Sequence, residues 1–434
     1  MNEELIRQIS SLAQNVFSSL HQPKPFIAGQ SSIPVTGKYF DSREIASAMI
    51  AAGEFWLTSG PATEEFEGKL AKRVGVRHAH MVNSGSSANL LALSALTSKQ
   101  LGDRRLMPGD EVLTVAAGFP TTVAPILQNG LVPVYVDIDL ETYVANTEEL
   151  EAAIGPKTKA VMMAHTLGNP FNLDVVTRLV KKHNLWLIED NCDALGGTYR
   201  EKALGSFGDL STLSFYPAHH ITTGEGGAVL SQRAILKPII ESFRDWGRDC
   251  WCAPGKDNTC LKRYDWKLGN LPEGYDHKYT YSHIGYNLKS GDIQAAIGLA
   301  QLERLDFFVE RRRSNFFQLS QSLEQLSDRL ILPKATQESN PSWFGFPITI
   351  KDGSRISRDE LVKHLNSHNI GTRLLFGGNL TRQPAFIDAP RRQLGDLKNT
   401  DTAMRDTFWV GIWPGLTREM LAYTSKTIIE KLND

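Results

Sequence analysis

The sequence predicts an α/β protein with a mostly parallel central sheet in a large domain and a smaller α+β domain at the C-terminal end. Between residues 78 and 231, short and continuously apolar segments alternate with helical segments. This alternation is typical of a parallel sheet with helices on both faces. The length of 434 residues supports more than one domain, because a single compact core rarely extends that far.

The composition is that of a soluble globular enzyme, with 41% hydrophobic and 22% charged residues. A net charge of −1 provides no basic surface for nucleic acid, and no run of eighteen apolar residues predicts a membrane-spanning helix. The first twenty residues mix charged and apolar positions, as an amphipathic helix does and a signal peptide does not. We therefore expect a cytoplasmic protein that binds neither nucleic acid nor a membrane.

The N-terminal segment, residues 1–55, is expected to form helices joined by an arm. Residues 23–37 are rich in Pro, Ser and Gly, which suits an arm or linker, and residues 42–53 have helical periodicity. The large domain is expected to span residues 56–291. It begins with a turn or strand and a helix, for which Thr63 is the expected N-terminal cap.

The strands of the large domain are predicted from short apolar runs bounded by turn residues. In chain order these runs are HAHMV, EVLTVAA, VPVYVDI, AVMMAHT, LWLIED, LSTLSFY and GAVL. Helical periodicity in ANLLALSAL and VVTRLVKKHN predicts helices between them.

A long insert, residues 246–286, interrupts this alternation. It contains glycines, tryptophans, tyrosines and three of the four cysteines, and a loop of that length in a compact domain is usually functional. Residues 292–326 then read as one long helix leading into the C-terminal domain, residues 292–434. That domain is expected to be a small α+β unit.

Three positions in the large domain suit ligand binding. The NSGSS turn lies between a strand and a helix, where Gly85 allows close approach of the backbone and Ser86 offers a hydroxyl for a phosphate. Asp190 ends an apolar strand at the edge where open α/β sheets bind ligands, although a turn or capping aspartate is the alternative. Phe119 follows another strand and can stack on a cofactor ring or belong to the core.

The segment SFYPAHHITTGEGG, from Ser214 to Gly227, resembles the cofactor-lysine segment of pyridoxal-phosphate-dependent sugar aminotransferases. When it is aligned on the Gly-rich turn, His219 replaces the lysine and His220 follows it. An imidazole cannot attach an aldehyde cofactor covalently, but it can hold and pass a proton near neutral pH. The segment therefore predicts a cofactor site without the covalent link, and a loop with two inert histidines is the alternative.

The order of these motifs along nearly the whole chain resembles the nucleotide-sugar aminotransferase family of fold type I, the aspartate aminotransferase-like fold. The resemblance implies a homodimer with pyridoxal or pyridoxamine 5′-phosphate in each large domain. The roles carried over by matching positions are phosphate contacts from Gly85, Ser86 and Ser214, ring stacking by Phe119, pairing of Asp190 with the pyridine nitrogen, a contact of Asp193 with the ring hydroxyl, and a contact of Asn287 with the partner subunit's phosphate. Relatives often have Gln or His where Asp193 stands, which puts its role in doubt.

The cysteines suggest a metal group, because disulfides are rare in a reducing compartment. Cys250, Cys252 and Cys260 fall within eleven residues, and Cys192 lies two residues after Asp190. Four thiolates are the usual ligands of a [2Fe–2S] cluster, and the spacing differs from that of common zinc sites, although zinc and four independent thiols are alternatives. A ligand at Cys192 would place the cluster beside the cofactor ring.

With His219 in place of lysine and the cysteines in this spacing, the chain closely resembles the CDP-4-dehydro-6-deoxyglucose 3-dehydratases, and this resemblance implies a [2Fe–2S] cluster on the four cysteines. The resemblance implies removal of the C3 hydroxyl from a nucleotide-linked 4-keto-6-deoxyhexose during synthesis of 3,6-dideoxyhexoses for surface polysaccharides such as O-antigen. It also implies His219 as the general base, with His220 as the competing candidate, and an NAD(P)H-dependent flavin or iron–sulfur reductase as electron donor.

Several alternatives to this assignment remain. A thymidine-linked sugar is the alternative substrate, and a sugar aminotransferase or a non-enzymatic protein on the same fold is the alternative function. Arg373 is a candidate for binding the sugar or the diphosphate, because arginine suits bidentate contacts with oxyanions, and a surface salt bridge is the alternative.

Overall fold

The computed structural model describes residues 1–22, 24–253 and 255–433, and it confirms the mostly parallel central sheet. Eight strands lie in the order β1-β9-β8-β5-β4-β2-β3-β14. Neighbours from β8 to β14 are parallel, and β9 runs antiparallel to both β1 and β8. The strands are β1 (His78–Val82), β2 (Glu111–Val115), β3 (Val132–Val136), β4 (Thr158–Ala164), β5 (Trp186–Asp190), β8 (Leu210–Ser214), β9 (Gly227–Ser231) and β14 (Arg392–Gln393).

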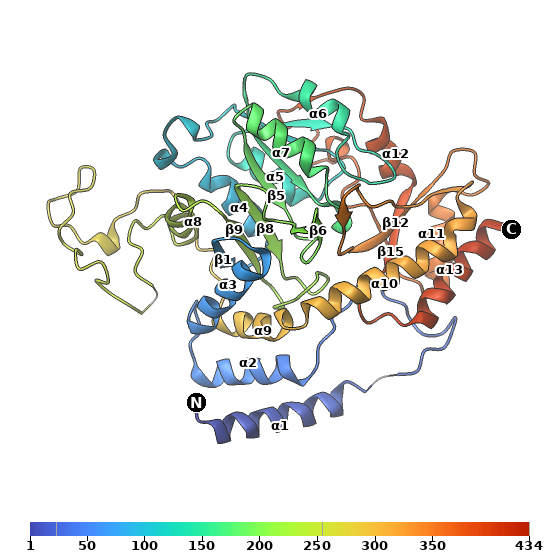
Figure 1. Ribbon diagram of the computed structural model, residues 1–434, viewed down its shortest axis with the longest axis horizontal. Helices are drawn as coiled ribbons and strands as arrows, with labels where there is room; N and C mark the ends of the chain where they lie inside the picture. The colour runs from blue at the N-terminus through green and yellow to red at the C-terminus, as the bar shows by residue number, and fades with distance from the viewer. Residues whose placement is uncertain (23, 254, 434) are drawn as a thin grey trace.

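Helices cover both faces of this sheet, as the apolar strands predict (Figure 1). Successive residues of a strand point to opposite faces, so that Val112 and Leu113 of β2 belong to two different hydrophobic cores. The helices that pack on the sheet are α3 (Pro61–Val74), α4 (Gly85–Ala95), α5 (Pro120–Gln128), α6 (Thr147–Ala153), α7 (Leu173–Lys182) and α8 (Leu236–Arg244).

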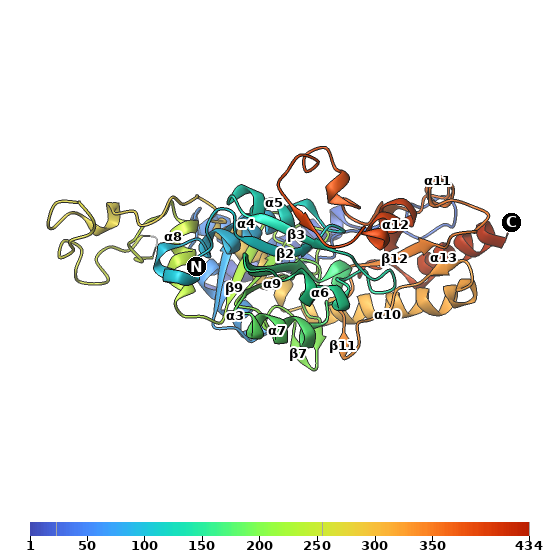
Figure 2. The same cartoon turned by 90° about the horizontal axis from the view of Figure 1, so that it is seen from above.

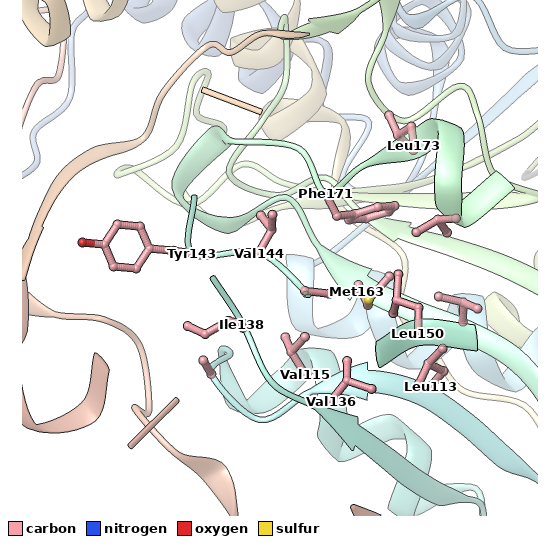
Figure 3. Packing of buried hydrophobic residues seen from close by; sticks show 14 of the residues in the cluster. Leu113, Val115, Val136, Ile138, Tyr143, Val144, Leu150, Met163, Phe171 and Leu173 are labelled. Atoms are coloured by element: carbon pink, nitrogen blue, oxygen red, sulfur yellow. The ribbon is translucent and has the colours of Figure 1, made fainter. Parts of the chain in front are cut away.

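One of the two cores fills the space between the sheet and helices α6 and α7 (Figure 3). Leu113, Val115 and Val136 come from the strands, while Leu150 and Leu173 come from the two helices. All five side chains are at most 5% exposed. This packing holds the sheet rigid and fixes the strand ends, where the predicted site lies.

The N-terminal helices form where the sequence predicts them. Helices α1 (Glu3–Leu20) and α2 (Ser42–Glu54) pack on each other, and α2 packs on α9 (Asp292–Leu302) (Figure 1). No helix among the described residues is long and apolar enough to cross a membrane.

The predicted cap of α3 is wrong, because the helix begins at Pro61 with Gly60 as its N-terminal cap. The carboxylate of Asp292 accepts hydrogen bonds from the N–H groups of Gly60 (2.9 Å), Ala62 (3.0 Å) and Thr63 (2.8 Å). The Thr63 hydroxyl also donates to this carboxylate. A residue far away in the sequence therefore caps the helix, and no local pattern reveals it.

The prediction of a single long helix over residues 292–326 is also wrong. The chain forms α9 and then α10 (Leu305–Leu323), separated at Glu303 and Arg304. Arg304 has φ −103° and ψ 3°, and its guanidinium forms ion pairs with Asp41 and Glu44 beside α2. These tertiary ion pairs hold Arg304 out of the helix.

A second, antiparallel sheet has the strand order β10-β12-β15-β13. Its strands are β10 (Leu330–Ile331), β12 (Gly345–Ile350), β13 (Thr372–Leu374) and β15 (Thr407–Gly411), and the accompanying helices are α10, α11 (Arg358–Ser367), α12 (Lys398–Asp406) and α13 (Arg418–Asn433). The described residues also include a small sheet of β6 (Thr198–Tyr199), β7 (Lys202–Ala203) and β11 (Ser339–Asn340), and the 3₁₀ turns η1 (Lys99–Arg104), η2 (Thr166–Gly168), η3 (His277–Tyr279), η4 (Glu324–Leu326) and η5 (Leu380–Arg382).

The insert, residues 246–286, projects from the body of the molecule beyond α8, and both views show it as an extended loop (Figures 1 and 2). Its aromatic side chains pack on one another, since the ring of the buried His277 lies against those of Trp251 and Trp266. The division of the chain at residues 55 and 291 remains a proposal.

Candidate functional site

A cavity of about 840 Å³ opens at the carboxyl ends of the parallel strands. Most of the predicted site residues line it: Gly85, Ser86, Phe119, Asp190, Cys192, Asp193, Ser214, His219 and Arg373. Strand-end loops of the large sheet bring all of these together except Arg373, which comes from β13 of the second sheet. The site therefore lies between the two sheets.

One end of the cavity suits a phosphate group. Ser84 caps α4, its hydroxyl accepting from the N–H of Ser87 at 3.0 Å, and the first N–H groups of a helix have no partner within the helix. The Ser86 hydroxyl lies 3.1 Å from the Thr121 hydroxyl, and Ser214 ends β8 beside Gly85. Free N–H groups, hydroxyls and the positive end of the helix dipole together favour an anion here.

Gly85 has a steric reason to be glycine. A Cβ atom at this position would lie 2.4 Å from the Ser214 Cβ and 3.1 Å from its Cα. Only a residue without a side chain allows the start of α4 to approach the end of β8 this closely.

The carboxylate of Asp190 is buried and held by a network of hydrogen bonds. Its Oδ2 accepts from Asn89 Nδ2 at 2.8 Å and from Thr122 Oγ1 at 2.7 Å, while Oδ1 accepts from the N–H of Cys192 at 3.2 Å. The Asn89 Oδ1 in turn accepts from the Thr212 hydroxyl at 2.6 Å. These neutral donors fix the orientation of a carboxylate at the edge of the cavity, where it can pair with a cationic ring nitrogen.

His219 faces the cavity, and Asp193 lies next to it. The His219 Nδ1 and Asp193 Oδ1 atoms are 3.3 Å apart, close enough for electrostatic pairing but without the alignment of a hydrogen bond. The ring of Phe344 lies on the other side, with 5.1 Å between the two ring centroids. The imidazole is therefore held between a carboxylate and an aromatic ring, and its other nitrogen remains available to a ligand.

His220 lies behind His219 and does not line the cavity. Its side chain is 3% exposed, and Nε2 is 3.4 Å from the carbonyl oxygen of Ser342. Burial and the positive charge of Arg312 lower the pKa of His220 well below the ordinary value of 6.5. His220 is therefore a neutral, buried residue without access to a ligand.

The outer part of the cavity is aromatic and carries one free cationic side chain. Phe119 is 51% exposed and packs edge-to-face against Phe376. Arg373 donates to the carbonyl oxygen of Thr372 at 2.8 Å and forms no salt bridge with any carboxylate in the part of the chain that the structure describes. An exposed guanidinium at the rim of a cavity can bind an anionic ligand.

The four cysteines are not gathered into one site. Cys192 lines the cavity, where burial and the charge of Asp190 raise the pKa of its thiol well above 9. Cys250, Cys252 and Cys260 belong to the projecting insert, in which the thiols of Cys250 and Cys252 interact. Among residues 1–22, 24–253 and 255–433, no group of three or more His, Cys, Asp or Glu side chains is arranged to hold a metal ion.

Asn287 also lies outside the cavity, on the exposed segment that returns from the insert. Its Oδ1 accepts from Lys289 Nζ at 3.0 Å, and the Lys289 ammonium also binds Asp245 at 2.7 Å. The side chain is accessible at the surface, as its predicted contact with a partner subunit requires.

Several residues of the site do not appear in the sequence prediction. Asn89 and Thr122 hold Asp190, and a signal for Asn89 exists, because it is a polar residue one turn after Gly85 that stands directly before the apolar run LLAL. Trp409 comes from β15 of the second sheet and Phe344 directly precedes β12, and nothing in their local sequence distinguishes them from core residues.

Comparisons with known proteins agree with this geometry. The profile of the DegT/DnrJ/EryC1/StrS aminotransferase family matches residues 39–429. The lipopolysaccharide biosynthesis protein RfbH of Salmonella typhimurium is 58% identical over 419 residues, covering 96% of each chain. A dTDP-4-dehydro-2,6-dideoxy-D-glucose 3-dehydratase of Saccharopolyspora spinosa is 54% identical over 405 residues, covering 93% of this chain and 87% of the relative.

Solved structures show the same fold. The GDP-4-keto-6-deoxy-D-mannose-3-dehydratase of E. coli with bound hydrated PLP superposes with a TM-score of 0.82 at 28% identity, covering 91% of this chain and 99% of that one.

Proposed function

The chain belongs to the DegT/DnrJ/EryC1/StrS aminotransferase family and has the pyridoxal-phosphate-dependent fold type I of its solved relatives, and we propose that it removes the C3 hydroxyl of a nucleotide-linked 4-keto-6-deoxyhexose. The observation that carries this proposal is His219. A histidine stands in the cavity where an aminotransferase of this family needs a lysine, and it lies within 3.3 Å of the Asp193 carboxylate. Relatives named as sugar 3-dehydratases support the same reaction class.

The residues of the cavity fit pyridoxamine 5′-phosphate. Gly85, Ser86 and Ser214 would hold the phosphate, at the place where α4 approaches the end of β8 too closely for a Cβ atom at position 85. Asp190, fixed by Asn89 and other neutral donors, would keep a proton on the ring nitrogen. Because a histidine cannot attach the cofactor covalently, binding would be non-covalent. The cofactor supplies an amine for the C4 ketone of the sugar and a ring that accepts electrons.

His219 would act as the general base. With Nδ1 turned toward Asp193, its Nε2 would be the nitrogen that takes up a proton in the cavity and delivers it to the departing C3 hydroxyl. Asp193 would stabilise the positive charge that develops on the imidazole. The contact of Asp193 with the ring hydroxyl, which the sequence resemblance implies, is the alternative role.

We favour a cytidine-diphosphate sugar, CDP-4-dehydro-6-deoxy-D-glucose, on the basis of the sequence resemblance. The thymidine-linked sugar is the second candidate, because a 54% identical relative carries the name of a dTDP-linked 3-dehydratase. The exposed Arg373 is the proposed contact to the diphosphate or the sugar.

We further propose that the four cysteines bind a [2Fe–2S] cluster and that an NAD(P)H-dependent flavin or iron–sulfur reductase is the partner, since the dehydrated sugar needs two electrons to become a 3-deoxy ketosugar. The number of thiols and the position of Cys192 in the cavity support this. Because the described residues do not bring the insert cysteines to Cys192, binding requires the insert to approach the body, and we assign no step of the reaction to the cluster.

The proposed cluster and substrate are tested with protein purified without air. These conditions keep the thiols reduced, as the expected cytoplasmic environment does. We expect two iron atoms and two acid-labile sulfides per chain, and a fourfold Cys→Ser variant as control should contain neither. Incubation with CDP- and TDP-4-keto-6-deoxyglucose, a reductase and NADH should yield the 3-deoxy ketosugar from one of them. Transfer of an amino group to the sugar, with no loss of the C3 hydroxyl, would establish the aminotransferase alternative.

The choice of base is tested by His219→Asn and His220→Asn. Removing a general base typically costs 10²- to 10⁴-fold, so we expect a loss of that order in kcat for His219→Asn. His220→Asn, which alters a buried residue outside the cavity, should retain most of the activity in folded protein. Full dehydration activity in the His219 variant would refute the assignment.

A further inference from the structure

Arg312 in α10 carries a buried positive charge beneath the site. Its side chain is 1% exposed, and within the described part of the chain it forms no ion pair with a carboxylate. Burial lowers its pKa to about 10, and the attraction of Asp193 opposes that shift. The guanidinium therefore remains protonated at neutral pH. Burying a cation without a carboxylate partner costs folding free energy. An apolar side chain would fill the same space without that cost, so the hydrogen bonds of Arg312 are its distinguishing feature.

These hydrogen bonds go to backbone carbonyls on two sides of the cavity. Nη2 donates to the carbonyl oxygens of Ala218 at 3.2 Å and His219 at 3.3 Å. Nη1 donates to those of Trp343 at 3.3 Å and Phe344 at 3.1 Å, directly before β12 of the second sheet. One guanidinium thus ties the loop of the large sheet that carries His219 to the segment of the second sheet that carries Phe344.

The same residues also contact each other through their side chains. The Phe344 ring lies 5.1 Å from the His219 ring, and the Arg312 guanidinium lies 5.7 Å from the centroid of Phe344. A planar group with donors on two edges can hold two carbonyl pairs at once, whereas a lysine ammonium on a flexible chain cannot span them.

We infer that Arg312 is a positioning residue, which sets the place of His219 in the cavity by fixing its backbone against the second sheet. As far as it concerns catalysis, this inference rests on the proposed function. The competing explanation is that Arg312 only stabilises the packing between the two sheets. A test must therefore separate the place of residue 219 from the stability of the protein.

Arg313 provides a matched control on the same helix. Its Nε donates to the carbonyl oxygen of Pro341 at 3.0 Å and its Nη2 to that of Asn340 at 2.9 Å. Arg313 therefore binds the same chain segment, which leads from β11 into β12, but makes no hydrogen bond to the His219 loop within the described residues. A purely structural role predicts similar effects for Arg312→Met and Arg313→Met, and a positioning role predicts different ones.

The first experiment places a chemical probe at position 219. In a His219→Lys variant, the new amine should capture pyridoxal 5′-phosphate covalently, and borohydride followed by mass spectrometry measures the rate of capture. We expect the rate to fall at least tenfold when Arg312→Met is added and to stay within twofold when Arg313→Met is added. Equal rates in all three proteins would overturn the inference. Failure of the His219→Lys variant itself to capture the cofactor would instead count against the proposed cofactor site.

The second experiment measures dehydration in chains that retain His219. We expect Arg312→Met to lower kcat by about 10- to 100-fold with KM within about twofold, because a displaced base affects the chemical step more than substrate binding. Arg313→Met should leave kcat within about twofold. If Arg312→Met does not fold, as judged by circular dichroism, Arg312→Lys decides the question. That variant keeps the charge but cannot reach both carbonyl pairs, so wild-type kcat in Arg312→Lys would also overturn the inference.

Discussion

Two neighbouring histidines in one loop have opposite environments. His219 lines the cavity between Asp193 and Phe344, while His220 is 3% exposed and its pKa is lowered by burial and by Arg312. A proton acceptor must reach its ligand, and only His219 does. At the scale of the residue, access and a carboxylate partner distinguish the proposed base from an ordinary buried histidine.

Asp193 should matter for the rate more than for binding. Asp193→Asn keeps the size of the side chain but removes the negative charge 3.3 Å from His219 Nδ1. We expect kcat to fall about 10- to 100-fold, less than for loss of the base itself, with the affinity for cofactor nearly unchanged. Steady-state kinetics and a cofactor titration followed by absorbance measure both quantities. A loss of cofactor affinity with normal kcat would instead support a contact between Asp193 and the cofactor ring.

At the scale of the element, the site depends on how closely helices and strands approach. The start of α4 touches the end of β8 at Gly85, and α3 begins on the carboxylate of Asp292 at the start of α9. In both places one residue determines where a helix terminus lies. The position of a helix terminus decides where its free N–H groups point, and hence where an anion can bind.

Gly85→Ala should separate α4 from β8. The added methyl group would lie 2.4 Å from the Ser214 Cβ, so we expect the affinity for pyridoxamine phosphate to fall more than tenfold and stability to fall by about 1–3 kcal/mol. Gly68→Ala is the matched control, because Gly68 lies in α3 with nothing within 4 Å of the added atom, and alanine there should be neutral or slightly stabilising. Cofactor titration and urea denaturation compare the two variants. Equal cofactor affinity in both would contradict a phosphate site at Gly85.

Asp292→Ala should destabilise the junction of α3 and α9. The change leaves the N–H groups of Gly60, Ala62 and Thr63 without their acceptor, at an expected cost of about 1–3 kcal/mol. Asp292→Asn keeps an acceptor oxygen and should lose less. Urea denaturation of the three proteins measures the difference, and identical midpoints for Asp292→Ala and wild type would show that water replaces the carboxylate without cost.

At the scale of the whole molecule, the cavity is lined by residues from both the parallel and the antiparallel sheet. Arg373, Phe344 and Trp409 reach the cavity from the antiparallel sheet, while Asp190 and His219 come from the parallel one. The proposed site therefore requires both sheets to be folded and packed. Any loss of stability in one core is expected to reduce the fraction of chains that can bind the cofactor.

Stability should fall in mild acid because of buried histidines. Burial lowers the pKa of His80 and of His220 well below 6.5. Above pH 6.5 both are neutral in the folded and unfolded chain and have no effect. Below pH 6.5 the unfolded chain binds protons that the folded chain cannot bind. Each such histidine therefore lowers the free energy of unfolding by about 1.4 kcal/mol for each pH unit.

His80→Gln provides the test of this pH dependence. Both ring nitrogens of His80 are buried without hydrogen-bond partners, so the change removes a titrating group from a core outside the cavity. Urea denaturation between pH 7.5 and 5 should show a shallower loss of stability than in wild type. His21→Gln, at an exposed position, should leave the slope unchanged. An equal slope in all three proteins would show that other groups dominate the acid transition.

The sequence by itself determined the elements whose causes are local. Apolar runs of four to seven residues became the strands β1 to β5, β8 and β9, because burial on both faces selects continuous apolar sequence. Gly85 and Asp190 were predicted as site residues because turns and strand ends of a parallel sheet converge at one edge, and Ser214 and His219 because their segment resembles the cofactor-lysine segment of sugar aminotransferases. Each of these inferences needs only neighbours along the chain.

The tertiary structure decided whatever depends on residues that are distant in sequence. Asp292 caps α3, Arg304 interrupts the expected long helix, and Phe344 and Arg312 surround His219 from other elements. The insert that contains three of the cysteines projects from the body, and the described residues form no metal-holding group, although the cysteine spacing suggests a single site. These hydrogen bonds and ion pairs join residues that lie a few ångströms apart in space but far apart in the sequence. No local pattern records them, and they decide which side chains surround His219 in the cavity.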